Sequence, residues 1–92
     1  MERSEIKEKL IGKLAELFED RNIDSDLLEY VDLFDDMGMD SMAFITIVVE
    51  IEAIFGIIIP DDALLMENFR KVDNIVELVA NEFKIKDDGE KS

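Results

Sequence analysis

Asp40 and Ser41 are the side chains of this sequence with the clearest chemical potential. They follow Gly38 and precede an apolar stretch, so we expect Asp40 to cap a helix and Ser41 to lie in its first turn. The amino end of a helix carries partial positive charge, so a phosphate ester on Ser41 would be well placed there. The same spacing is also expected if Asp40 is only a helix cap and Ser41 only a first-turn residue. Among Asp-Ser pairs at helix starts, this purely structural role is the commoner one.

The chain lacks the side chains on which most enzymes depend. Its 92 residues contain no His and no Cys, so the commonest general base and the thiolate nucleophile are both absent. No Lys or Arg lies between Arg21 and Arg70, which leaves Ser41 without a neighbouring base in the sequence. The adjacent Asp61 and Asp62 are expected to interact with a helix dipole rather than to catalyse. We therefore expect no catalytic residues, and a protein that is not an enzyme.

Acidic residues dominate the composition. The formal net charge is −14, which excludes a nucleic-acid backbone as partner and favours a basic partner surface. Loops that start at Asp32 or Asp36 lack the Gly and Glu that a calcium-binding EF-hand requires, so no metal site is predicted. The longest uncharged run, 41–49, is far shorter than the ~20 residues of a membrane span. We expect a soluble, cytoplasmic monomer.

Apolar residues recur at helical spacing in three longer segments, and Gly and Pro separate them. This pattern predicts one all-α domain over 1–92, with an ordered core at 4–84 and a flexible polar tail at 85–92. We expect a four-helix bundle with three longer helices, one short helix and a long structured loop, 24–40, pinned by Leu33 or Phe34 before the second helix. The expected helices are 4–20 with Ser4 as its cap, 40–55 ended by Gly56, a short one at 61–66, and 72–83.

The order of motifs resembles that of the acyl carrier protein family. Residues 33–42 read LFDDMGMDSM, similar to the family signature in which Asp-Ser-Leu follows a Gly two residues upstream. Residues 55–62 read FGIIIPDD and residues 67–72 read ENFRKV, again in the family's order. The resemblance extends over about residues 6–83, nearly the whole chain.

The resemblance implies a function at one position. Ser41 matches the serine that a phosphopantetheinyl transferase esterifies with 4′-phosphopantetheine, and Asp40 would help to position it. The protein would then present acyl or aminoacyl groups as thioesters to loading and condensing enzymes. The alternative is an acidic helical interaction module that keeps the fold and is never modified.

Departures from the family pattern concern the second helix and the segment after it. The helix has Met42 where the family commonly has Leu, and its acidic residues are only Glu50 and Glu52. Met42, Ile45 and Val49 share one face beside Ser41, and they either pack under the long loop or form an apolar surface for partner enzymes. Of the three, Met42 is expected to be the most exposed and Ile45 the most buried. Residues 64–69 form a longer segment than in fatty-acid carriers, which favours an aminoacyl, D-alanyl or specialised stand-alone carrier.

Overall fold

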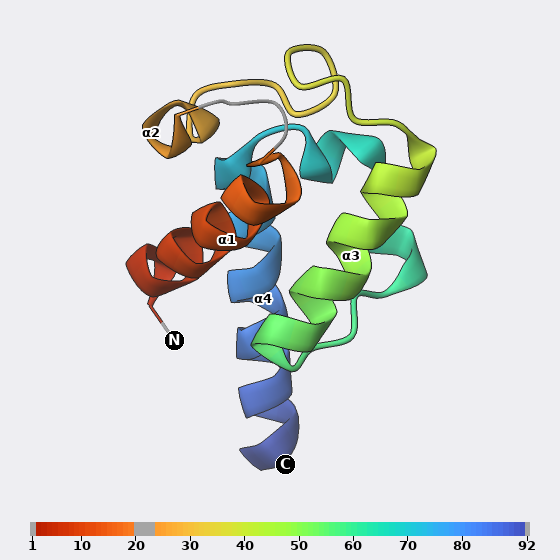
Figure 1. Cartoon of the computed structure of the whole chain (residues 1–92). Coiled ribbons are helices and arrows are strands. Elements are labelled where there is room, and N and C mark those ends of the chain that lie inside the picture. The colour runs from red at the N-terminus through yellow and green to blue at the C-terminus, as the bar shows by residue number, and fades with distance from the viewer. Residues whose placement is uncertain (1, 20–23, 92) are drawn as a thin grey trace.

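The regular secondary structure of the described residues is all helical. A computed structural model describes residues 2–19 and 24–91, apart from the side chains of Ser25 and of residues 85–91. Within these ranges there is no strand, and three of the four α-helices are long, which confirms the all-α prediction (Figure 1). The elements in order are α1 (Arg3–Leu17), α2 (Ser25–Leu28), α3 (Ser41–Phe55), the 3₁₀ turns η2 (Asp61–Ala63) and η3 (Met66–Phe69), and α4 (Val72–Lys91).

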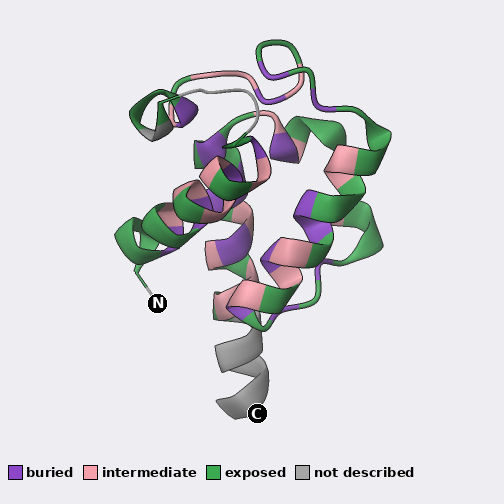
Figure 2. Ribbon diagram, in the orientation of Figure 1, coloured by how far each residue is buried: buried purple, intermediate pink, exposed green. Residues whose placement is uncertain are grey.

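One apolar core joins the three long helices. Helices α1 and α4 pack along each other, and α3 lies beside them (Figure 1). Each contributes residues three or four apart, which places them on one helix face and removes that face from water (Figure 2). The fully or almost fully buried residues are Ile6, Leu10 and Leu14 of α1, Ile47 and Ile51 of α3, and Val72, Ile75 and Val79 of α4.

The ends of α3 follow the prediction, whereas the start of α1 does not. Gly56 ends α3 with φ +64°, a left-handed conformation that residues with a Cβ adopt only at a cost. The cap of α1 is Glu2, without a side-chain cap hydrogen bond, so the prediction of Ser4 as cap is wrong. The predicted end of the first helix falls on residues 20–23, which lie outside the described residues.

The structure differs from the sequence prediction in two places. The predicted helix 61–66 is wrong because η2 and η3 replace it, whereas the short helix α2 is a helical turn of the kind expected within the loop 24–40. Leu65 adopts an extended backbone between η2 and η3, and the Asn68 side chain donates a hydrogen bond to the Ala63 carbonyl (2.8 Å), which stabilises the break. Helix α4 continues to Lys91, beyond Phe83, where the apolar periodicity ends.

Candidate functional site

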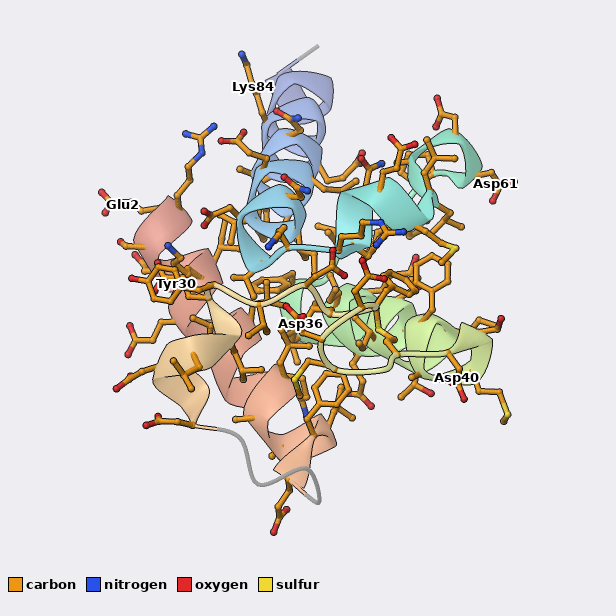
Figure 3. The ribbon with its side chains drawn as sticks, turned by 90° about the horizontal axis from the view of Figure 1, so that it is seen from above. Glu2, Tyr30, Asp36, Asp40, Asp61 and Lys84 are labelled. Carbon is orange, nitrogen blue, oxygen red and sulfur yellow. The ribbon has the colours of Figure 1, made fainter. Side chains whose placement is uncertain are left out.

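Asp40 and Ser41 lie where the sequence predicted, at the amino end of α3. The Asp40 carboxylate accepts a hydrogen bond from the backbone N–H of Ala43 (2.9 Å), and its carbonyl accepts one from Phe44 (2.9 Å). Asp40 is therefore the N-cap, as predicted. Ser41 is the first residue of the helix and is exposed to solvent. Figure 3 shows Asp40 at the outer end of α3, on the side of the molecule opposite Glu2.

The surroundings of Ser41 suit a phosphate ester. The backbone N–H groups of Ser41 and Met42 precede the first intrahelical hydrogen bond, and they have no acceptor among the atoms that the structure describes. Because α3 has 15 residues, its dipole adds partial positive charge at this end. A group attached through phosphate to the Ser41 hydroxyl therefore meets free donors and open solvent.

The segment that leads into Ser41 is an ordered loop, which we call the acidic loop (residues 29–40). Its organising side chain is Asp32, whose Oδ1 accepts hydrogen bonds from the N–H groups of Phe34 and Asp35, each at 2.9 Å. The carboxylate of Asp36 in turn accepts from the Asp32 N–H (2.8 Å). Leu33 is fully buried beneath the loop, so the prediction that an apolar residue anchors it is confirmed.

Arg70 fastens the acidic loop to the start of α4. Its Nη1 lies 3.3 and 3.4 Å from the two carboxylate oxygens of Asp32 and 3.5 Å from Asp35 Oδ2. The guanidinium carbon lies 5.5 Å from the centre of the Phe34 ring, within the range of a cation–π contact. This contact was not predictable from local sequence patterns, because Arg70 and Asp32 are far apart in the chain. Its only signal was that Arg70 ends a long interval without cations.

The pKa of the Asp32 carboxyl lies below its ordinary value of 3.8. The largest cause is the hydrogen bond from the Asp35 N–H, followed among the lowering causes by the Phe34 N–H and by Arg70; partial desolvation opposes them. Because the folded state favours the ionised form, Asp32 stabilises the fold above its ordinary pKa. This contribution is lost as the pH falls through the lower, folded-state pKa.

An Asp32→Asn variant tests this linkage. We expect it to melt below the wild type at pH 7, and we expect the difference to disappear as the pH falls below 3.8. The comparison requires circular dichroism melting curves from pH 2.5 to 7 for both proteins. Asp62→Asn, a change at an exposed carboxylate, is the control for the charge lost. A constant difference across the whole pH range would contradict the linkage.

The face of α3 beside Ser41 is an exposed apolar surface. Met42, Ile45 and Val49 have 79%, 61% and 56% of their surface exposed. They are spaced by three and four residues and therefore share one side of the helix. The interpretation that they pack under the loop is wrong, and so is the expectation that Ile45 is the most buried of them. We call these three residues the apolar stripe.

Both glutamates of α3 are engaged within the protein. Glu50 lies 3.5 Å from Lys13 Nζ on α1, and Glu52 Oε2 accepts a hydrogen bond from the Ile59 N–H (2.9 Å). The remaining polar side chain beside the stripe, Thr46, donates to the Met42 carbonyl (3.0 Å). Helix α3 therefore presents an apolar surface next to Ser41. The carboxylates of Glu50 and Glu52 contact other parts of the protein.

Among the side chains of residues 2–19, 24 and 26–84, no three acidic groups converge in a way that could hold a metal ion. Over the same ranges, no helix combines the length and the apolar character needed to cross a membrane.

The chain matches a known protein family. The family model described as "Phosphopantetheine attachment site" matches residues 8–79, which include most of α1, the acidic loop, α3 and the first part of α4. No curated protein matches the chain. The match spans well over half of the 92 residues, and it agrees with the all-helical fold and with the exposed serine at the start of α3. The chain therefore belongs to the phosphopantetheine attachment family, whose members carry 4′-phosphopantetheine.

Proposed function

We propose that this protein is an acyl carrier protein and that Ser41 is the residue that bears its 4′-phosphopantetheine. The observation that carries the proposal is the exposed Ser41 hydroxyl at the amino end of α3, inside the region that the family model matches. The attached group would supply the thiol that a chain without cysteine lacks, and that thiol would hold acyl or aminoacyl groups as thioesters.

Each residue of the site has a defined part in this proposal. Ser41 Oγ forms the phosphodiester while the pyrophosphate bond of coenzyme A breaks, which leaves adenosine bisphosphate. The free N–H groups of Ser41 and Met42 lie where they can stabilise the phosphate of the product. Asp40 positions Ser41 by fixing the first turn of α3 through its bond to Ala43.

The partners in this proposal are enzymes. A phosphopantetheinyl transferase modifies the protein, and loading and condensing enzymes then act on its cargo. The carrier itself performs no catalysis, works as a monomer, and acts in the cytoplasm. We propose that these enzymes dock on the apolar stripe, because its three residues lie exposed beside Ser41 and both glutamates of α3 have internal partners.

The proposed class of cargo rests on the length of one segment of the chain. The 64–69 segment, which contains the turn η3 (Met66–Phe69), is the longer segment that favours an aminoacyl, D-alanyl or specialised carrier over a fatty-acid carrier. Loading assays with adenylating and acyl-transferring enzymes encoded near this protein would identify the cargo.

An intact-mass measurement tests the carrier proposal. The apo protein is incubated with coenzyme A, magnesium and a broad-specificity phosphopantetheinyl transferase. We expect a mass gain of one phosphopantetheine group, and we expect peptide mapping to assign it to the peptide that contains Ser41. No gain would contradict the proposal and favour the unmodified interaction module.

A further inference from the structure

We propose that Arg70 is a positioning residue for the modification of Ser41. Arg70 holds the acidic loop in one conformation. In that conformation the transferase can bind the loop and Ser41 at the same time. This inference rests on the proposed function, because it concerns the same reaction at Ser41. It gives a role to Arg70 of the η3–α4 junction, for which the motif at 67–72 by itself assigns none.

Arg70 contacts the acidic loop in three different ways. Its guanidinium pairs with Asp32 (3.3 Å) and Asp35 (3.5 Å), and it lies over the Phe34 ring. Its backbone carbonyl also accepts a hydrogen bond from the Leu33 N–H (2.7 Å). All the carboxylate contacts come from Nη1, and the planar guanidinium also lies over the Phe34 ring, a stacked contact that a lysine ammonium does not reproduce. Arg70 therefore restrains both the backbone and the side chains of the loop.

Short backbone contacts connect this anchor to the cap of α3. The Asp32 carbonyl accepts from Asp36 (2.8 Å), and the Leu33 carbonyl accepts from Met39 (3.1 Å). Met39 is buried, and it directly precedes Asp40, the cap that fixes the first turn of α3. A displacement at Asp32 is thus transmitted through ordered residues to the segment that presents Ser41.

Aromatic packing ties the same junction to α3. The Phe44 ring lies 5.9 Å from the Phe34 ring and 5.1 Å from the Phe69 ring, measured between centroids. Phe69 is fully buried and immediately precedes Arg70. The loop, the first turns of α3 and the η3–α4 junction therefore form one packed unit around Phe44.

Electrostatics makes the restraint necessary. The acidic loop carries Glu29, which pairs with Lys7 of α1, and four aspartates, and the repulsion among these aspartates favours an expanded loop. Arg70 is the cation that contacts Asp32 and Asp35; its neighbour Lys71 instead reaches the Tyr30 carbonyl (3.4 Å). Without the guanidinium, the transferase would have to order the loop on binding, which weakens binding because conformational entropy is lost at that step.

A matched ion pair elsewhere separates positioning from general stabilisation. Arg3 forms two hydrogen bonds of 3.0 Å with Glu77 and joins α1 to α4. Figure 3 shows Glu2, its neighbour in the chain, and Asp40 at opposite sides of the molecule. Arg3→Met therefore removes an arginine ion pair of similar kind at a distance from Ser41, and it serves as the control for Arg70→Met.

The experiment measures transferase kinetics on the full apo chain. For Arg70→Met we expect KM to rise about 10-fold with kcat little changed, because misplacement of a recognised segment costs roughly 10- to 100-fold. Arg70→Lys should fall between Arg70→Met and the wild type, since it keeps the charge and loses the planar guanidinium over the Phe34 ring. Arg3→Met should lower the melting temperature and leave kcat and KM unchanged.

A second readout does not depend on the reaction. In ¹⁵N–¹H spectra of the apo proteins, the amide signals of Gly38 to Met42 should shift in Arg70→Met and keep their positions in Arg3→Met. Should Arg70→Met fail to fold, Arg70→Lys provides the same comparison.

The outcomes distinguish this inference from the proposed function. A wild type that gains no phosphopantetheine rejects both. A modified wild type with unchanged KM in the Arg70 variants rejects the positioning role alone. The positioning role is also rejected if Arg3→Met and Arg70→Met raise KM equally at equal loss of melting temperature.

Discussion

Substitution of Ser41 by Ala is expected to abolish attachment of 4′-phosphopantetheine completely, while the fold stays intact. The hydroxyl is the atom that would form the new bond, so its removal leaves no acceptor, and no partial activity can survive. Ser41 is exposed, and the cap of α3 is provided by Asp40, so loss of the oxygen should leave the helix and the melting temperature nearly unchanged. Intact mass after reaction with coenzyme A and the transferase, together with a melting curve, measures both effects.

The chain contains two matched serine controls for this substitution. Ser25 also follows an aspartate that caps a helix, because Asp24 accepts a hydrogen bond from Asp26 (3.0 Å), and Ser4 lies in the first turn of α1. Ser25→Ala and Ser4→Ala should both gain one phosphopantetheine, as the wild type does. Modification of Ser41→Ala, or loss of modification in Ser25→Ala, would assign the attachment to another residue and contradict our proposal.

A double substitution in the apolar stripe, Met42→Glu with Val49→Glu, is expected to raise the KM of the loading enzyme about 100-fold, which corresponds to roughly 2.8 kcal/mol. Both side chains are more than half exposed in the free protein, so burial against a partner would contribute apolar area that glutamates cannot replace. The same exposure means that the fold should tolerate the change. Steady-state kinetics of loading of the holo protein, with a melting curve, tests this expectation.

The control for added charge lies on another surface. Leu27 and Ile58 are 52% and 83% exposed, in α2 and in the connection that follows α3, so Leu27→Glu with Ile58→Glu adds the same two charges outside both the stripe and the acidic loop. We expect this control to load like the wild type. Apolar docking also predicts a KM that changes little with salt, whereas docking through charges weakens steeply as salt rises. If KM depends strongly on salt and does not change with the stripe substitutions, the partner enzymes recognise the carboxylates of the protein and not its apolar stripe.

The sequence alone determined that the protein has no His or Cys side chains. It also determined where the long helices lie and that Ser41 is at the start of one of them. Absence of His and Cys is a property of composition, which folding does not alter. The long helices were predictable because their buried residues repeat every three or four positions, and Asp40 and Gly56 were predictable because capping depends on local backbone geometry.

The tertiary structure decided which surfaces are covered and which distant residues meet. Local spacing placed Ile45 beside Met42 and Val49, but only the path of the acidic loop left Ile45 61% exposed. The pairing of Arg70 with Asp32 depends in the same way on how the η3–α4 junction packs against that loop. Periodicity reports which residues share a side of one helix, whereas burial and ion pairing depend on neighbours that other parts of the chain supply.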